Sequence, residues 1–281
     1  MKISYQIIKI YVVNFGLNNT FIHDSLNTMK SLKIFLCLCL FSSKLIGATD
    51  GIYFHSNWGF NYAMNSVLSI KNNDGDIVHK ASWEGRSFID SPYYTVRLDN
   101  WNDKSTVGIE WVHYKMYLKN PPSGIDNLSI SDGYNILFFN IGKRNKRNII
   151  QRVGAGIIVA HPDVTLTGRE RFWNKGGISG AYISGLAIQA SFERWVYETN
   201  RHIITSEIKL SSGYARIPIS NNSNEFADIP HIALHVVLGI GSKPLKIKST
   251  WVDYVNYFIV PTIHHYSIYR FKKVKDFLFK D

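Results

Sequence analysis

The sequence predicts an all-β chain that folds as an antiparallel, up-and-down transmembrane β-barrel of eight strands. Three observations indicate this fold class. Apolar and polar residues alternate in many separate segments, turn-forming residues separate these segments, and residues 29–48 have the layout of an export signal. A barrel strand crosses a bilayer with about ten residues of which every second one is apolar, so a barrel needs no long apolar run.

The first 48 residues are set apart from the fold. Residues 29–48 place two lysines before the apolar run 34–41 and end in Gly47 and Ala48, as a secretory signal peptide does. The alternative interpretation of this run is a buried hydrophobic helix. Residues 1–28 precede the signal, and we predict that they form an upstream extension outside the native protein, with translation starting at Met29.

Composition supports an exported chain. Both cysteines, Cys37 and Cys39, lie inside the predicted signal, so the mature chain would have no disulfide and no cysteine-based metal site. The formal charge is +11, and removing residues 1–48, with five lysines and one aspartate, leaves +7. A moderately basic exported protein is suited to acidic lipid head groups and lipopolysaccharide phosphates. Nucleic acid is not an expected partner, because the basic residues are scattered.

Period-two alternation predicts the strands in order along a barrel domain that spans residues 49–242. The clearest case is the last strand, in which Ile232, Leu234 and Val236 oppose His231 and His235. The eight predicted strands are residues 51–62, 91–101, 107–118, 133–142, 152–160, 185–193, 202–213 and 230–241.

The connections carry turn chemistry and differ in length. Segments with turn chemistry are expected at 101–105, 119–124, 142–148 and 197–201, and long connections at 161–177 and 218–228. Outer-membrane barrels typically have tight periplasmic turns and longer extracellular loops. A soluble β-sandwich or a lipocalin-type barrel is the competing class. Aromatic residues near the strand ends favour the membrane barrel, because they form girdles at the membrane interfaces.

Several blocks carry a resemblance to a known family. They are residues 83–98, 108–118, 130–142, 152–164 and 185–193. Their order and spacing resemble a proteobacterial family of small outer-membrane β-barrels, in particular the lipid A oxidase-like branch, over roughly Asp50 to Gly241. The resemblance implies oxidation of the proximal glucosamine of lipid A and contact with the barrel-assembly machinery.

The chain departs from that family after the eighth strand. Members of the family end at a terminal aromatic residue, whereas residues 243–281 follow here as a C-terminal extension. This extension would supply further strands, which would make ten, or a surface helix, or an appended segment.

Charged residues on the polar strand faces are predicted to fill the lumen. An eight-stranded barrel is too narrow for an open channel, and buried charges need partners, so a network of ion pairs is expected. The predicted lumen network comprises Arg97, Asp99, Glu193, Glu207, Lys209, His231 and His235. No metal site is predicted, since His231 and His235 lie about 13 Å apart on a strand.

The segment 110–118, EWVHYKMYL, holds the candidate catalytic residues Glu110, His113 and Lys115. Strict alternation would put Glu110 inside but His113 and Lys115 on the lipid face. A one-residue bulge near Trp111 and Val112 is therefore predicted, which would turn the later half of the strand around. Tyr114, Met116 and Leu118 would then meet lipid, while His113, Lys115 and Tyr117 would turn inward.

The predicted function is structural or interactive at the cell surface, as an integral barrel of the outer membrane with a polar, side-chain-filled lumen. The alternative is an enzyme that oxidises lipid A, and a lipid A esterase is the third candidate. His55 and Ser56 invite the esterase hypothesis but fall on opposite faces of their strand. Expected partners are outer-membrane lipids, lipopolysaccharide and the barrel-assembly machinery, with the protein a monomer and no cofactor predicted.

Overall fold

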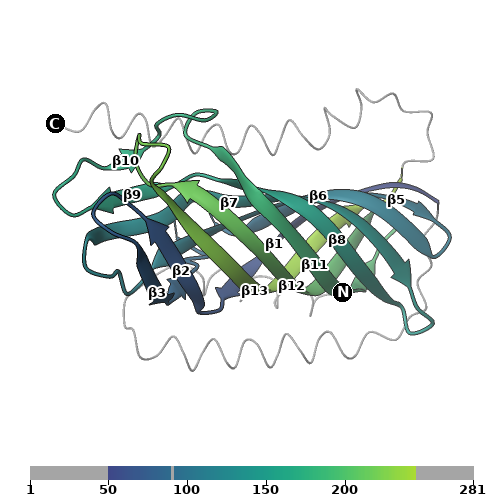
Figure 1. Ribbon diagram of the computed structural model, residues 1–281. Coiled ribbons are helices and arrows are strands. Elements are labelled where there is room, and N and C mark those ends of the chain that lie inside the picture. Colours follow the sequence, from purple (N-terminus) through teal and green to yellow (C-terminus); the bar gives the residue numbers. More distant parts are fainter. Residues whose placement is uncertain (1–49, 90–91, 245–281) are drawn as a thin grey trace, which may run out of the picture. The chain divides into compact units, whose positions relative to one another are not determined.

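The computed structural model describes residues 50–89 and 92–244 of the chain (Figure 1). The predictions for residues 1–28, for the signal peptide at 29–48 and for nearly all of the C-terminal extension fall outside these residues. Within the described ranges, no helix has the length and apolar character needed to cross a membrane.

Eight long strands form a closed antiparallel ring, and the predicted fold class and its eight strands are confirmed. Each predicted segment overlaps one strand of the ring. In chain order these are β1 (Gly51–Ala63), β5 (Tyr94–Asn102), β6 (Ser105–Leu118), β7 (Ile125–Arg144), β8 (Ile149–Ala160), β11 (Tyr182–Glu198), β12 (His202–Pro218) and β13 (Phe226–Ser242). Each strand pairs with its neighbours in this order, and β1 pairs with β13 to close the ring.

Tight turns join the strands at one end of the ring. Asp103 and Asn148 occupy left-handed backbone conformations there, with φ of 48° and 64°. Asp and Asn tolerate this region better than other residues that carry a side chain. By the usual arrangement of outer-membrane barrels, this end faces the periplasm and the opposite end lies outside.

Five short strands that the sequence did not predict lengthen the wall at the extracellular end, to the left in Figure 1. They are β2 (Ser66–Lys71), β3 (Ile77–Ala81), β4 (Trp83–Glu84), β9 (Asp163–Leu166) and β10 (Phe172–Trp173). β2 pairs with the start of β13, and β9 with the start of β7. The predicted long connection 161–177 is therefore partly strand, and the connection predicted at 218–228 is confined to residues 219–225 between β12 and β13.

The outer wall is apolar along the middle of the strands. On β11 the outward residues Leu186, Ile188 and Phe192 are 59–71% exposed. β7, β12 and β13 show the same alternation, and their exposed apolar residues include Leu137, Phe139, Ile141, Ile204, Ile208, Leu210, Leu234, Leu238 and Ile240. A contiguous apolar exterior of this extent is incompatible with water and fits the hydrocarbon layer of a membrane.

The lumen is layered, whereas the sequence analysis expected a polar filling throughout. At the periplasmic end, Tyr53, Trp101 and Trp195 pack with Ile150 and Ile203. A layer of charged side chains follows. Towards the extracellular end the filling is apolar and merges with the core beneath the short strands, through residues such as Leu68, Val112, Met116, Ile130, Ile217 and Ile229.

The predicted bulge in the segment 110–118 is wrong. β5 and β6 pair without interruption as far as His113, so the alternation continues through Trp111 and Val112. Tyr114 and Met116, predicted to meet lipid, are 1% and 0% exposed in the core. The irregularity lies instead on β7, where pairing with β6 jumps from Tyr134 to Ile130. Extra residues on the partner strand leave the facing of β6 unchanged.

A lysine placed in the apolar outer wall should destabilise the barrel. Ile188→Lys puts a charge among the lipid-facing residues of β11 and should cost about 2–4 kcal/mol of unfolding free energy, measured by urea titration in phospholipid vesicles. The matched control is Ile178→Lys, since Ile178 is 83% exposed but lies in the extracellular connection before β11. Equal costs for the two variants would contradict a membrane-facing wall.

Candidate functional site

The charged layer of the lumen is centred on Arg97 of β5, which is 1% exposed. Its guanidinium donates to Asp99 at 3.0 Å, to Glu207 at 2.9 Å and to Glu193. These carboxylates come from β5, β12 and β11, so one cation links three strands of the barrel. Charge-assisted hydrogen bonds of this kind are the strong ones in proteins.

Two further cations complete the layer. Arg152 of β8 donates to Asp99 at 3.0 Å and lies 3.4 Å from Glu193. Lys209 of β12 donates to Glu110 at 2.5 Å. Three cations therefore face four carboxylates, Asp99, Glu110, Glu193 and Glu207, in a region closed to water. Each of these seven charges has an opposite charge within 4 Å, which offsets the large cost of burying it.

Neutral polar groups fill the remaining hydrogen-bonding positions around Glu110. Asn140 donates to the Glu110 carboxylate at 3.2 Å and Gln189 at 2.9 Å. Arg152, Asn140 and Gln189 were not among the predicted network residues. Arg152 could have been found, because it shares the inward face of β8 with Gly154 and Gly156, whereas neutral Asn and Gln carry no comparable signal.

His231 and His235, both predicted lumen residues, lie on the extracellular side of the charged layer and form hydrogen bonds with different partners. His231 lies between two tyrosines, 2.5 Å from the Tyr114 hydroxyl and 3.1 Å from that of Tyr134. His235 is 2.8 Å from the Ser211 hydroxyl. In the part of the chain that the structure describes, no group of three or more His, Cys, Asp or Glu could hold a metal ion.

The three candidate catalytic residues are not brought together. Glu110 lies in the lumen and pairs with Lys209, while His113 and Lys115 follow the outward alternation of β6. His113 stacks on Tyr94 with ring centroids 4.8 Å apart and bonds Asn135 at 2.7 Å. Lys115 donates to the backbone carbonyl of Ile89, and both side chains are almost fully buried. Glu110 is thus separated from the other two by the barrel wall.

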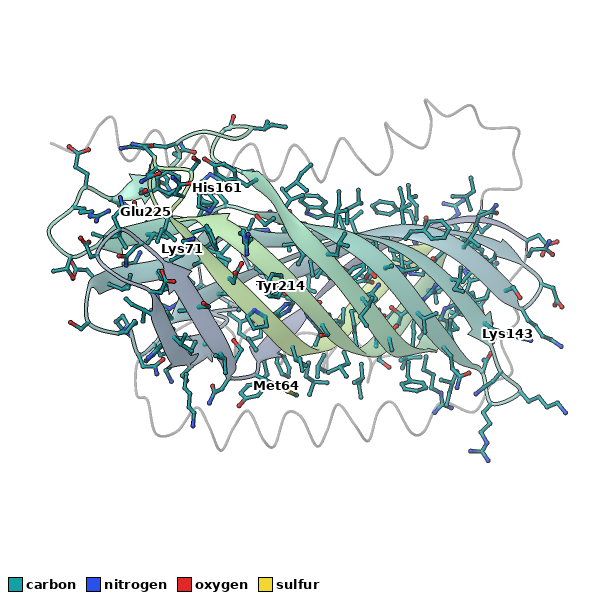
Figure 2. All side chains as sticks on the ribbon, in the orientation of Figure 1. Met64, Lys71, Lys143, His161, Tyr214 and Glu225 are labelled. Carbon is teal, nitrogen blue, oxygen red and sulfur yellow. The ribbon has the colours of Figure 1, made fainter. Side chains whose placement is uncertain are left out.

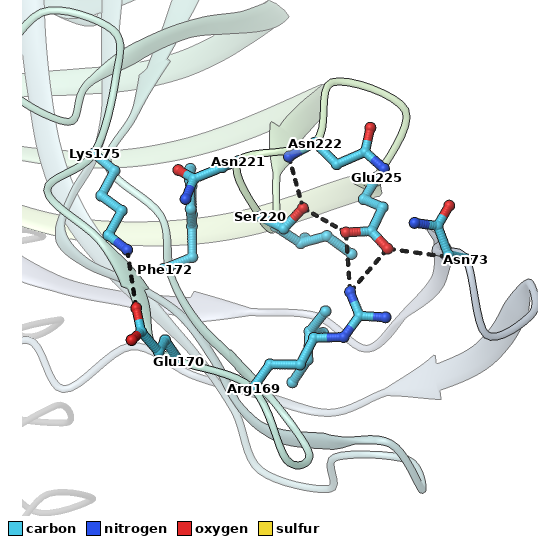
Figure 3. A pocket seen from close by; sticks show the side chains of 11 residues that line it. Asn73, Arg169, Glu170, Phe172, Lys175, Ser220, Asn221, Asn222 and Glu225 are labelled. Atoms are coloured by element: carbon cyan, nitrogen blue, oxygen red, sulfur yellow. Dashed lines mark hydrogen bonds and ion pairs between the residues drawn. The ribbon is translucent and has the colours of Figure 1, made fainter.

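A second polar cluster ties the extracellular loops together and was not predicted (Figure 3). Glu225, 2% exposed, accepts two hydrogen bonds from Arg169 at 2.9 and 3.1 Å, one from the backbone N–H of Asn73 at 3.0 Å and one from the Ser220 hydroxyl. Arg169 also donates to Asp74 at 2.6 Å. We call Asn73, Asp74, Arg169, Ser220 and Glu225 the loop clip. It joins the connections after β2, β9 and β12.

The loop clip borders an open pocket of about 330 Å³. Phe172 and Lys175 line the pocket on the side away from Glu225, and Lys175 pairs with Glu170 at 3.7 Å. Burial alone would raise the pKa of Glu225, but the hydrogen bonds from Ser220, Asn73 and Arg169 outweigh it and lower that pKa. The hydrogen bond to Glu225 raises the pKa of Arg169. The clip is therefore an ion pair at neutral pH.

Removing the central lumen cation should destabilise the barrel strongly. Arg97→Met leaves buried carboxylates without their shared partner and should cost about 3–5 kcal/mol, read from urea unfolding in vesicles. Arg86→Met is the control, because Arg86 and Glu84 form an ion pair whose side chains are 43% and 46% exposed. That pair should contribute less than about 1 kcal/mol. A small loss for Arg97→Met would show that the lumen ions relax or take up water.

Loss of the Glu225 charge should loosen the extracellular loops without unfolding the barrel. Glu225→Gln should lower the hydrogen-exchange protection of residues 72–76 and 219–225 by about 1 kcal/mol, roughly fivefold. Glu170→Gln is the matched control, since its side chain is 93% exposed.

The same clip should respond to acid in a defined direction. Because the pKa of Glu225 is lowered by folding, its contribution is complete above the unfolded glutamate pKa of about 4.3 and is lost as pH falls through the folded value. Wild-type protection, corrected for intrinsic exchange, should then converge on that of Glu225→Gln. A constant difference between the two at low pH would refute this linkage.

The comparisons with known proteins find likeness in structure alone. No family model matches the sequence, and no curated protein matches it either. Among solved structures, the chain is similar to the outer membrane protein AlkL in lipid bilayers, at 12% identity and TM-score 0.43, covering 74% of this chain and 96% of that one. It is also similar to OprG from Pseudomonas aeruginosa, at 12% identity and TM-score 0.40, covering 70% and 99%. A third is Neisserial surface protein A, at 10% identity and TM-score 0.33, covering 69% and 97%. The resemblance to the lipid A oxidase-like branch stays a prediction from the sequence.

Proposed function

We propose that the protein is an integral outer-membrane β-barrel with a structural or surface-interaction role. This proposal is carried by the contrast between an outer wall that is apolar along the middle of the strands and a layer of buried charges in the lumen that are paired with one another. An ion network with this degree of pairing stabilises a wall, and it leaves its groups occupied with one another. Partners would then bind at the extracellular loops and at the extracellular edge of the barrel.

The extracellular end supports a surface role. The five short strands and the loop clip hold the connections in one ordered unit, at a place where loops of a membrane barrel meet the outside. Lipopolysaccharide and outer-membrane lipids are the proposed contacts of the wall. The barrel-assembly machinery is the proposed partner during insertion, and a monomer is the proposed state.

Lipid A modification is the second candidate, and the position of His113 and Lys115 favours it. Both lie on the outer face of β6 near its extracellular end, which in a membrane is the level of the outer-leaflet head groups, although both are almost fully buried there and Lys115 is covered by the Ile89 carbonyl. Arg86 lies nearby, 4.1 Å from the ring centroid of Tyr117. Glu110 would not take part in such a site, because it is enclosed in the lumen.

Mass spectrometry of lipid A distinguishes the two candidates. Lipid A from cells with and without the gene should have the same mass if the role is structural, whereas oxidation of the proximal glucosamine would add the mass of one oxygen atom. The protein should remain in carbonate-washed membranes and change its gel mobility on heating, which serves as the control for insertion. An oxygen-sized mass shift would contradict the structural role, and release by carbonate would contradict the membrane location.

A further inference from the structure

Basic side chains gather at the end of the barrel opposite the loop clip. They lie in and beside all three tight turns. Lys143, labelled in Figure 2, marks this end, and Glu225 marks the other. We define the basic rim as Lys104, Lys143, Lys146, Arg147 and Arg201, all exposed.

The two ends of the barrel treat their charges differently. At the extracellular end, the arginines are paired with acids, as in Arg169 with Asp74 and Glu225, Arg171 with Asp163, and Arg216 with Asp228. Among the described residues, the unpaired lysines of that end, Lys71, Lys80 and Lys119, are matched in number by acids without a lysine or arginine partner, Asp76, Asp126 and Asp132. Acidic side chains at the rim end, among the described residues, are Asp50, Asp103 and Glu198, and Glu198 pairs with Lys243. Five rim cations therefore face two acids that lack an ion pair, so this end has an excess of positive charge.

The rim adjoins the apolar wall. Lys143 is two residues beyond Ile141 on the outward face of β7, a rise of about 7 Å, and Ile141 is 52% exposed. A cation at that distance from the hydrocarbon layer lies at the level of the lipid phosphates. Long basic side chains at such a boundary extend their charged ends towards the head groups.

We propose that the basic rim binds the phosphate groups of anionic phospholipids in the membrane leaflet at the tight-turn end. Attraction of Lys and Arg to an acidic membrane surface supplies the binding, and the apolar wall beside Ile141 holds the acyl chains. A soluble acidic partner would not explain why the cations adjoin the lipid-facing band. The proposal does not depend on the function proposed for the extracellular end.

Native mass spectrometry of the full-length protein tests this proposal with two lipids, phosphatidylglycerol and phosphatidylcholine, added in equal amounts. The wild type should retain phosphatidylglycerol in preference by at least about tenfold. The variant Lys104→Gln, Lys143→Gln, Lys146→Gln, Arg147→Gln and Arg201→Gln should lose that preference. The control variant Lys71→Gln, Lys80→Gln and Lys119→Gln removes exposed lysines from the extracellular end and should keep it.

Each other outcome overturns the proposal. Equal retention of the two lipids by the wild type would mean that the rim does not select anionic head groups. An equal loss of the phosphatidylglycerol preference in both variants would mean that the overall charge of the protein, and not the basic rim, sets that preference. Displacement of the lipid by excess inorganic phosphate would show a site for free phosphate. Heat-modifiable gel mobility of each variant confirms that it is folded before lipid is added.

Discussion

The constraint on which the rest of the structure depends is the pairing of buried charges inside a narrow closed wall. The outside of the barrel is apolar, so polar side chains on the alternate strand positions have only the lumen to occupy. An unpaired ion there would cost several kcal/mol, so each must find an opposite charge on another strand. Arg97 satisfies this condition by reaching Asp99, Glu193 and Glu207 at once. The network thereby fixes the register of strands far apart in sequence.

The layered filling of the lumen follows from where the wall lies. The charged layer is sealed on the periplasmic side by Trp101 and Trp195. The guanidinium carbon of Arg144 lies 4.9 Å from the ring centroid of Trp101 and 3.8 Å from that of Trp195. Towards the outside, the wall extends beyond the membrane and is lined by short strands, and its filling resembles the core of a soluble protein. Leu68 and Ile70 of β2 belong to this core and are fully buried. One barrel thus combines a membrane-type exterior with two kinds of interior.

The eight ring strands were predictable because alternation carries the signal at every second residue. The short strands were not, since β4 and β10 have two residues each and their pairing depends on distant partners. In the segment 110–118, charge alone suggested that Lys115 must point inward. The structure instead covers Lys115 from outside with the carbonyl of Ile89, a contact between residues 26 positions apart that no local pattern reveals. The loop clip was missed for the same reason, as Asn73 and Glu225 are 152 positions apart.

Pairing of β1 with β13 has a consequence for how the chain folds. Phe54 lies opposite Ser242 and Ala63 opposite Ala233, so the final seam joins the two ends of the ring. Local hairpins such as β5–β6 can form early, because only two residues separate their strands. The β1–β13 seam can form only after all eight strands have formed, and the entropy cost of closing so long a loop makes its formation a slow step. Until then both edge strands expose unpaired backbone groups, and Arg97 lacks part of its set of carboxylate partners. Closure of the wall and completion of the charge network are therefore expected to be a single cooperative event.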